Sequence, residues 1–85
     1  MVKELVSVIS ADYAGDYRIR MRFSDGSKKT VDFSHWLDGR VFRPLRDVKE
    51  FRTFFLDGGT ICWPNGADIA PETLHDAADV GSSAA

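Results

Sequence analysis

The clearest pattern along the chain is a strict alternation of apolar and charged residues between positions 17 and 23. The apolar positions are Tyr17, Ile19, Met21 and Phe23, and the charged positions between them are Arg18, Arg20 and Arg22. A period of two is typical of a strand that buries one face and exposes the other. The pattern therefore predicts a strand at 17–23 with an arginine face directed to solvent.

The turn after this strand contains Gly26, and its length decides which residues of the return strand become buried. A two-residue loop would turn the apolar side chains of the return strand to solvent, so we reject it. A three-residue loop, with Gly26 in the left-handed conformation of a β-bulge, places Val31 opposite Ile19 and Asp32 opposite Arg18. We predict this register because each pair then matches in character.

Shorter patterns predict the other elements of the chain. The predicted elements are a first strand at 5–11, a helix at about 48–53 with Asp47 as its cap, a second hairpin at 54–63 around Asp57-Gly58-Gly59, and a helix at about 71–78. Residues 12–16 are expected to form a loop. The fold class that follows is α+β, with an antiparallel sheet of about four or five strands built from two hairpins and two short helices on one face.

Length and composition place further bounds on the fold and the setting of the protein. The chain has 85 residues, of which 44% are hydrophobic, which fits one small soluble domain at 1–80 followed by a mobile tail at 81–85. Its single cysteine, Cys62, allows neither an internal disulfide nor a multi-cysteine metal cage, and a reducing cytoplasm is the expected location. No signal peptide is visible, and no apolar run is long enough to span a bilayer.

The segment from Cys62 to Leu74 concentrates residues that restrict the backbone. Pro64, Asn65, Gly66 and Pro71 predict a tight corner between the second hairpin and the last helix, and Trp63 is expected in the core. Asp68 is expected to accept backbone N–H groups of the turn or of the helix start. The segment predicts a shape rather than a reaction.

The side chains that could carry chemistry also have simpler structural roles. Cys62 would need His35 or His75 as a base to act as a nucleophile, and a lone cysteine in an apolar strand is more often a small buried hydrophobe. Asp68, Glu72, His75 and Asp76 lie close in sequence, but a metal site needs three or four convergent ligands, so capping and solvation are favoured. We assign no catalytic, cofactor or metal residue.

The best candidate for a binding surface is the cationic sheet face. Its residues are Arg18, Arg20, Arg22, Lys28 and Lys29, and Trp36 is an aromatic that could anchor a partner. A solvated face and a protein-binding surface are the two main interpretations. Nucleic acid is disfavoured because the net charge is −2 and no aromatics for base stacking interleave with the arginines.

Several short motifs resemble, in their order and spacing, the small bacterial domain-of-unknown-function family numbered twenty-four forty-two. They are Phe23-Ser24-Asp25-Gly26, Val31-Asp32-Phe33, Val41-Phe42, Pro44-Leu45-Arg46-Asp47, Phe51, Trp63-Pro64-Asn65-Gly66-Ala67-Asp68 and Pro71. The resemblance covers residues 5–75, and the element that begins at Trp63 is its most specific part. Two departures are His75, where the family commonly has an aromatic, and Cys62, where a polar or charged residue is usual.

The resemblance implies a small α+β protein without an established activity. Some family members are fused to a helix-turn-helix, for which this chain is expected to have no room, and many are encoded in pairs that look like toxin and antitoxin modules. We therefore expect a non-catalytic protein-interaction module, antitoxin-like, that binds a small protein encoded next to it. The alternatives are a nucleic-acid-binding or transcription-associated accessory domain that uses Arg18, Arg20 and Arg22, a homodimer formed through an edge strand, and, ranked last, a small hydrolytic or metal-dependent enzyme.

Overall fold

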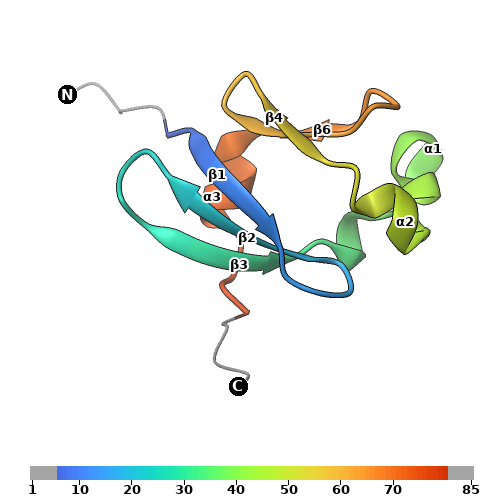
Figure 1. Ribbon diagram of the computed structural model, residues 1–85, viewed down its shortest axis with the longest axis horizontal. Helices are drawn as coiled ribbons and strands as arrows, with labels where there is room; N and C mark the ends of the chain where they lie inside the picture. Colours follow the sequence, from blue (N-terminus) through green and yellow to red (C-terminus); the bar gives the residue numbers. More distant parts are fainter. Residues whose placement is uncertain (1–5, 81–85) are drawn as a thin grey trace.

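Two three-stranded antiparallel sheets form the β part of the computed structural model, which describes residues 6–80 (Figure 1). The first sheet has the order β1-β2-β3, and the second has the order β4-β5-β6. The strands are β1 (Val8–Tyr13), β2 (Arg18–Phe23), β3 (Lys28–Asp32), β4 (Phe55–Asp57), β5 (Thr60–Cys62) and β6 (Asp68–Ile69). The α+β class is confirmed, whereas the prediction of one sheet of four or five strands is wrong. The two predicted hairpins lie in different sheets, and each pairs with an additional strand of its own.

The hairpin of the first sheet has the predicted register. Ile19 pairs with Val31, and Arg18 pairs with Asp32. Gly26 has a φ of 92°, which is the left-handed conformation that the three-residue loop requires. The alternation of apolar and charged residues along β2 is thus converted into one buried and one open face.

The first strand differs from its prediction at both ends. It covers Val8–Tyr13 rather than 5–11, and its last residue, Tyr13, pairs with Ile19 in a stretch that was expected to be a loop. The register shifts between Val8 and Ser10, as at a β-bulge, and Ile9 is exposed there. Ser10 and Asp12 are exposed and alternate with the partly buried Ala11 and Tyr13, but the turn-forming residues Asp12, Gly15 and Asp16 predicted a loop over the end of this strand.

Short helical segments connect the two sheets. They are η1 (Ser34–Trp36), α1 (Gly39–Phe42), η2 (Arg43–Arg46) and α2 (Val48–Phe51). Asp47 caps α2, as predicted, by accepting the Lys49 amide at 3.0 Å. The last helix, α3 (Pro71–Asp76), begins at the predicted proline and ends two residues earlier than predicted. The expected tail at 81–85 lies outside the described residues.

The second hairpin is confirmed, with Gly58 and Gly59 as its two-residue loop between Asp57 and Thr60. A third strand, β6, then pairs with β5 and was not predicted. The corner that begins at Trp63 therefore connects two strands, and only after β6 does the chain enter α3.

The core lies between the apolar face of the first sheet, the second sheet and the helices. The Trp63 indole donates from Nε1 to the carbonyl of Phe51 at 2.8 Å, and its ring lies edge-on to Phe33 at 6.0 Å between centroids. Leu74 of α3 is fully buried in the same cluster. The core role predicted for Trp63 is confirmed, and the opposite face of the first sheet is left open.

Candidate functional site

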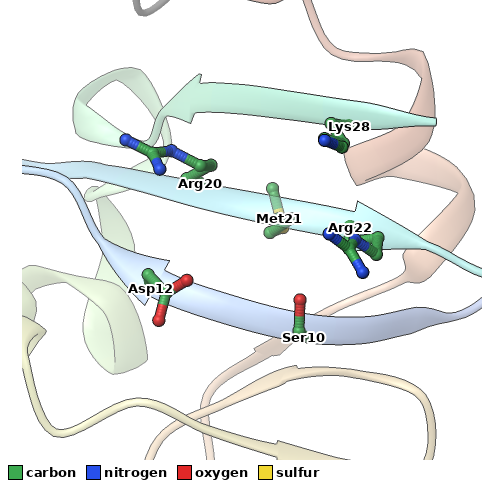
Figure 2. A pocket seen from close by; sticks show the side chains of 6 residues that line it. All are labelled: Ser10, Asp12, Arg20, Met21, Arg22 and Lys28. Atoms are coloured by element: carbon green, nitrogen blue, oxygen red, sulfur yellow. The ribbon is translucent and has the colours of Figure 1, made fainter.

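The open face of the first sheet carries three exposed cations, Arg20, Arg22 and Lys28. Figure 2 shows their side chains on the same face as Ser10 and Asp12, from three neighbouring strands. A shallow hollow of about 150 Å³ lies among these side chains and includes the buried Met21. We refer to Arg20, Arg22 and Lys28 as the cation face.

Register explains how the cations come to lie together. Ser10 pairs with Arg22, and Arg22 pairs with Lys28, so a hydroxyl and two cations form one row across the sheet. Asp12 pairs with Arg20 in the next row. The distance between the rows is set by the two-residue repeat of β2.

Two positive charges directly opposite each other are an unfavourable cross-strand pair. Arg22 and Lys28 occupy such a position, and among residues 6–80 no ion pair joins the cation face to a carboxylate. The ion pairs of the described chain are Arg46 with Asp38 and His75 with Asp25. The cation face therefore has an electrostatic repulsion that an anionic partner would relieve.

Arg18 is more enclosed than the other arginines of β2, and its Nε is buried without a hydrogen-bond partner among the described residues. Burial raises the pKa of its register partner Asp32, but hydrogen bonds from Ser34 outweigh this, and the charges of Arg18 and His35 add to them, so the pKa lies below its usual value. Arg18 thus acts on Asp32 through its charge, and the two groups form no ion pair within 4.0 Å in the described chain.

The structure separates Trp36 from the cation face. Trp36 lies in η1, after the end of β3, and is partly buried with its ring edge-on to Phe33 at 5.2 Å. The His35 ring lies beside it, tilted by 44°, with 4.5 Å between the ring centroids. Neither aromatic lines the hollow of the cation face, which is made by strand residues alone.

The corner that begins at Trp63 serves to hold the fold. Asn65 accepts the Ala67 amide at 3.1 Å and donates from Nδ2 to the carbonyl of Val41 at 2.9 Å, which ties the corner to α1. Gly66 has a φ of 95°. The capping role predicted for Asp68 is wrong, because Asp68 lies in β6 opposite Cys62 and the N-cap position of α3 is Ala70, which forms no side-chain cap bond. The turn acceptor is Asn65 instead.

Cys62 has none of the features of an activated thiol. Burial raises its pKa, and the neighbouring carboxylates of Asp57 and Asp68 raise it further. Its sulfur lies 3.6 Å from the carbonyl oxygen of Asp57. The histidines proposed as possible bases have other contacts, His35 with Trp36 and His75 with Asp25.

The acidic and histidine side chains near the C-terminal helix do not converge. Glu72 and Asp76 are exposed on α3, and within the part of the chain that the structure describes no three His, Cys, Asp or Glu side chains are placed to share a metal ion. Sequence reasoning missed the contact that His75 does make. Its Nε2 lies 2.9 Å from Asp25 Oδ2, and its ring lies edge-on to Phe23. These partners are about 50 residues distant in sequence, so no local pattern signals them.

A second hollow, of about 560 Å³, was also missed by sequence reasoning. It is lined by Gly39, Arg40, Arg43 and Pro44, which belong to α1 and η2. No periodicity in this stretch marks its two arginines as neighbours. Its two arginines provide a control for charge-reversal variants of the cation face.

Comparison with known proteins identifies the family to which most of the chain corresponds. A family model described as "Protein of unknown function (DUF2442)" matches residues 8–79. No curated protein matches, and no solved structure matches. No helix among residues 6–80 is long and apolar enough to cross a membrane.

Proposed function

The chain belongs to DUF2442, a family of proteins of unknown function, and on that premise we propose that it is a non-catalytic interaction module whose cation face binds an acidic protein partner. The resemblance noted above implies gene pairs of toxin and antitoxin type, and the partner we propose is the small protein encoded beside this one. Binding would mask a surface of the partner, as an antitoxin-like protein does.

The single observation that carries the proposal is the Arg22–Lys28 pair. Both side chains are exposed, they are direct register partners, and neither forms an ion pair with a carboxylate among the described residues. Like charges in this position lower the stability of a hairpin by a few tenths of a kcal/mol up to about 1 kcal/mol. A binding role gives a reason for such an arrangement, since complementary potentials set both association rate and specificity.

Support against a catalytic role comes from the same side chains that were candidates for one. The pKa of Cys62 is raised rather than lowered, and a thiol in this state is a poor nucleophile at neutral pH. His75 is engaged with Asp25, away from Cys62 in β5. We therefore propose binding rather than chemistry.

Nucleic acid is the second candidate partner, and the row of exposed cations favours it. Three cations on one face can contact phosphates, but the face offers no aromatic ring on which a base could stack. The two partners differ in salt dependence, because phosphate contacts release counterions and weaken steeply as salt rises. Binding of a 20-mer oligonucleotide and of the neighbouring protein, each measured at low and at physiological salt, separates them.

The decisive experiment is a pull-down and a titration of the purified chain with the product of the adjacent gene. The double variant Arg20→Glu/Arg22→Glu is expected to weaken the complex about tenfold or more, because it reverses two charges at the interface. The matched control is Arg40→Glu/Arg43→Glu, which reverses the same charges in the hollow of α1 and η2. Size-exclusion chromatography of each protein alone accounts for self-association.

Two results would contradict the proposal. One is the absence of any complex at micromolar concentration, which removes the partner. The other is an equal loss of affinity in both double variants, which would mean that overall charge rather than the cation face governs binding.

A further inference from the structure

We propose that the outer edge of β3 receives an acidic, extended segment of the partner as an added strand, in the place that Asp79 and Val80 occupy in the free chain. This inference rests on the proposed function, because it assumes that the partner is a protein that binds next to the cation face. It adds the chemical class of the bound segment and the contact that the segment must displace. We call residues 77–80 the C-terminal strap.

The hydrogen bonds of Thr30 show what the strap does. The Thr30 amide donates to Asp79 Oδ1 at 3.0 Å, and the Val80 amide donates to the Thr30 carbonyl at 2.8 Å. In an antiparallel sheet, a neighbouring strand makes the same two bonds to an outward-facing residue of an edge strand: it accepts that residue's amide and donates an amide to its carbonyl. The strap thus pairs the outward backbone groups of β3 at one residue, Thr30, and the carboxylate of Asp79 takes the place of a backbone carbonyl.

The strap does not itself form a strand, since residues 77–80 have no regular secondary structure. Figure 1 shows that the chain after α3 crosses the direction of β3 at its outer edge and does not run parallel to the strand. In an antiparallel ladder the outward residues alternate, so Lys28 and Asp32 face the same way as Thr30. An incoming strand would meet all three, whereas the hydrogen bonds from the strap to β3 within residues 6–80 are those to Thr30.

Charge around this edge specifies the kind of segment that fits. A hollow of about 330 Å³ lies beside Thr30 and is lined by Arg20, Lys28, Lys29 and Asp79. Lys29 donates from Nζ to the carbonyl of His75 and is held against α3. Arg20 and Lys28 belong to the cation face, and Asp79 is the one acidic residue that lines the hollow. An acidic side chain of the partner would replace Asp79 there and meet the same cations.

Strand addition obtains affinity from main-chain hydrogen bonds and specificity from alternate side chains. Because the strap occupies one of the positions to be paired, it competes with the partner and lowers the apparent affinity of the free chain. Loss of the strap contact should therefore strengthen binding, which is the opposite of what loss of a binding residue does. This reversal of sign distinguishes the inference from a general electrostatic attraction.

The test uses the intact chain and a seven-residue peptide that alternates valine and glutamate and has blocked ends. We expect the peptide to shift the amide resonances of Lys28, Thr30 and Asp32, and the matched peptide with lysine for glutamate to bind at least about tenfold more weakly. Asp79→Ala should bind the acidic peptide about tenfold more tightly, because the competing hydrogen bond to a charged group is gone. The matched control Asp79→Asn has the same charge as Asp79→Ala but keeps the oxygen acceptor, so its gain should be less than about threefold.

A second variant provides an independent test in case Asp79→Ala does not fold. Circular dichroism checks the folding of each variant. Val80→Pro removes the other strap hydrogen bond and should also tighten binding of the acidic peptide. The inference is overturned if neither Asp79→Ala nor Val80→Pro tightens binding, if the lysine peptide binds equally well, or if an oligonucleotide binds the β3 edge more tightly than the acidic peptide. If the neighbouring protein still forms its complex in that event, and the complex is sensitive to Arg20→Glu/Arg22→Glu, the proposed function stands without the edge.

Discussion

Two turns of the molecule, residues 23–27 and residues 63–67, have the same backbone hydrogen bonds, but their side chains contact different helices. In each, the backbone amide of the first residue donates to the backbone carbonyl of the fifth residue at 2.9 Å. The glycine at the fourth position has a φ of 92° in the first turn and 95° in the second. In each, an Asp or Asn side chain at the third position accepts the amide of the fifth residue, at 2.9 Å and 3.1 Å. An Asp or Asn followed by glycine is thus sufficient to specify this loop twice in one chain.

The difference lies in the atoms that the turn itself does not use. Asp25 directs its second oxygen to His75 of α3, whereas Asn65 directs its amide group to the carbonyl of Val41 in α1. Ser24 uses its backbone amide to bond Ser7, and Pro64, at the matching position, has no amide to offer. The common backbone fixes each hairpin, and the remaining atoms decide which helix the hairpin holds.

The largest effect is expected at the aromatic residue that begins each turn. Phe23→Ala and Trp63→Ala should each lower the free energy of unfolding by about 3–5 kcal/mol, because both side chains are fully buried. Trp63→Ala should lower it more, since it also removes the donor to the Phe51 carbonyl. Urea denaturation followed by circular dichroism measures both. Ile9→Ala, at an exposed position, is the control, and equal losses in control and core variants would contradict the comparison.

The glycines test whether the two backbones are equivalent in energy as well as in geometry. Gly26→Ala and Gly66→Ala should each lower the free energy of unfolding by about 1–2 kcal/mol, because an L residue is strained at these φ values. A Cβ would meet no atom within 4 Å at either site, so strain alone is measured. Denaturation midpoints of the two variants should agree. A difference of more than about 1 kcal/mol between them would break the equivalence.

Exchange of the third residues should separate the shared role from the different ones. Asn65→Asp keeps the turn acceptor but loses the donor to Val41, and should lower the free energy of unfolding by about 0.5–1.5 kcal/mol. Asp25→Asn also keeps the turn acceptor, and at neutral pH it measures instead the loss of the charged carboxylate that accepts from Ser27 and contacts His75. Thermal or urea unfolding at neutral pH gives both values.

Acid separates the two turns further. Hydrogen bonds from Ser27, and then His75, lower the pKa of Asp25 from 3.8 to about 2. A lowered folded-state pKa means that the contribution of Asp25 is complete above about pH 4 and is lost as pH falls through about 2. Wild type should therefore lose more stability than Asp25→Asn between pH 5 and pH 2, whereas Asn65→Gln should retain the full pH dependence. Parallel curves for wild type and Asp25→Asn would show that the carboxylate of Asp25 is not the titrating group.

The smallest effect is expected at the pair next to each turn, Arg22 with Lys28 and Cys62 with Asp68. Lys28→Gln should raise the free energy of unfolding by about 0.2–1 kcal/mol, because it removes a like-charge pair. Asp68→Asn should change it by less than about 0.5 kcal/mol, because Asp68 caps no helix. Loss of stability in Lys28→Gln would mean that the cations of the first hairpin do not repel each other.

The two turns also differ in how much of the surrounding fold could be predicted from the sequence. Strict alternation along β2 together with Gly26 predicted the register of the first hairpin correctly, because a shift of one would expose every apolar side chain. The turn at residues 63–67 was interpreted as a corner into a helix, although it has the same Asx-Gly step. Pro64 and the two-residue length of β6 concealed a strand that alternation cannot reveal.

Contacts that are distant in sequence account for most of what could not be predicted. The Asp25–His75 contact and the Thr30–Asp79 bond join positions 50 and 49 residues apart. Arg20, Arg22 and Lys28 share one face as predicted, whereas Arg18 is more enclosed and Lys29, expected on the same face, is held against α3. The pairing of Arg22 with Lys28 follows from the register and could be predicted. The separation of Trp36 from the cation face could not, because it depends on how the chain bends after β3.

The most direct test of the central claim is the affinity of the neighbouring protein for wild type and for Lys28→Gln, measured by calorimetric titration of folded samples. If the cation face exists for binding, Lys28→Gln is expected to form a more stable protein with a several-fold weaker complex. An affinity equal to that of wild type, with the same gain in stability, would contradict the account, because the charge at Lys28 would then serve neither the fold nor the partner.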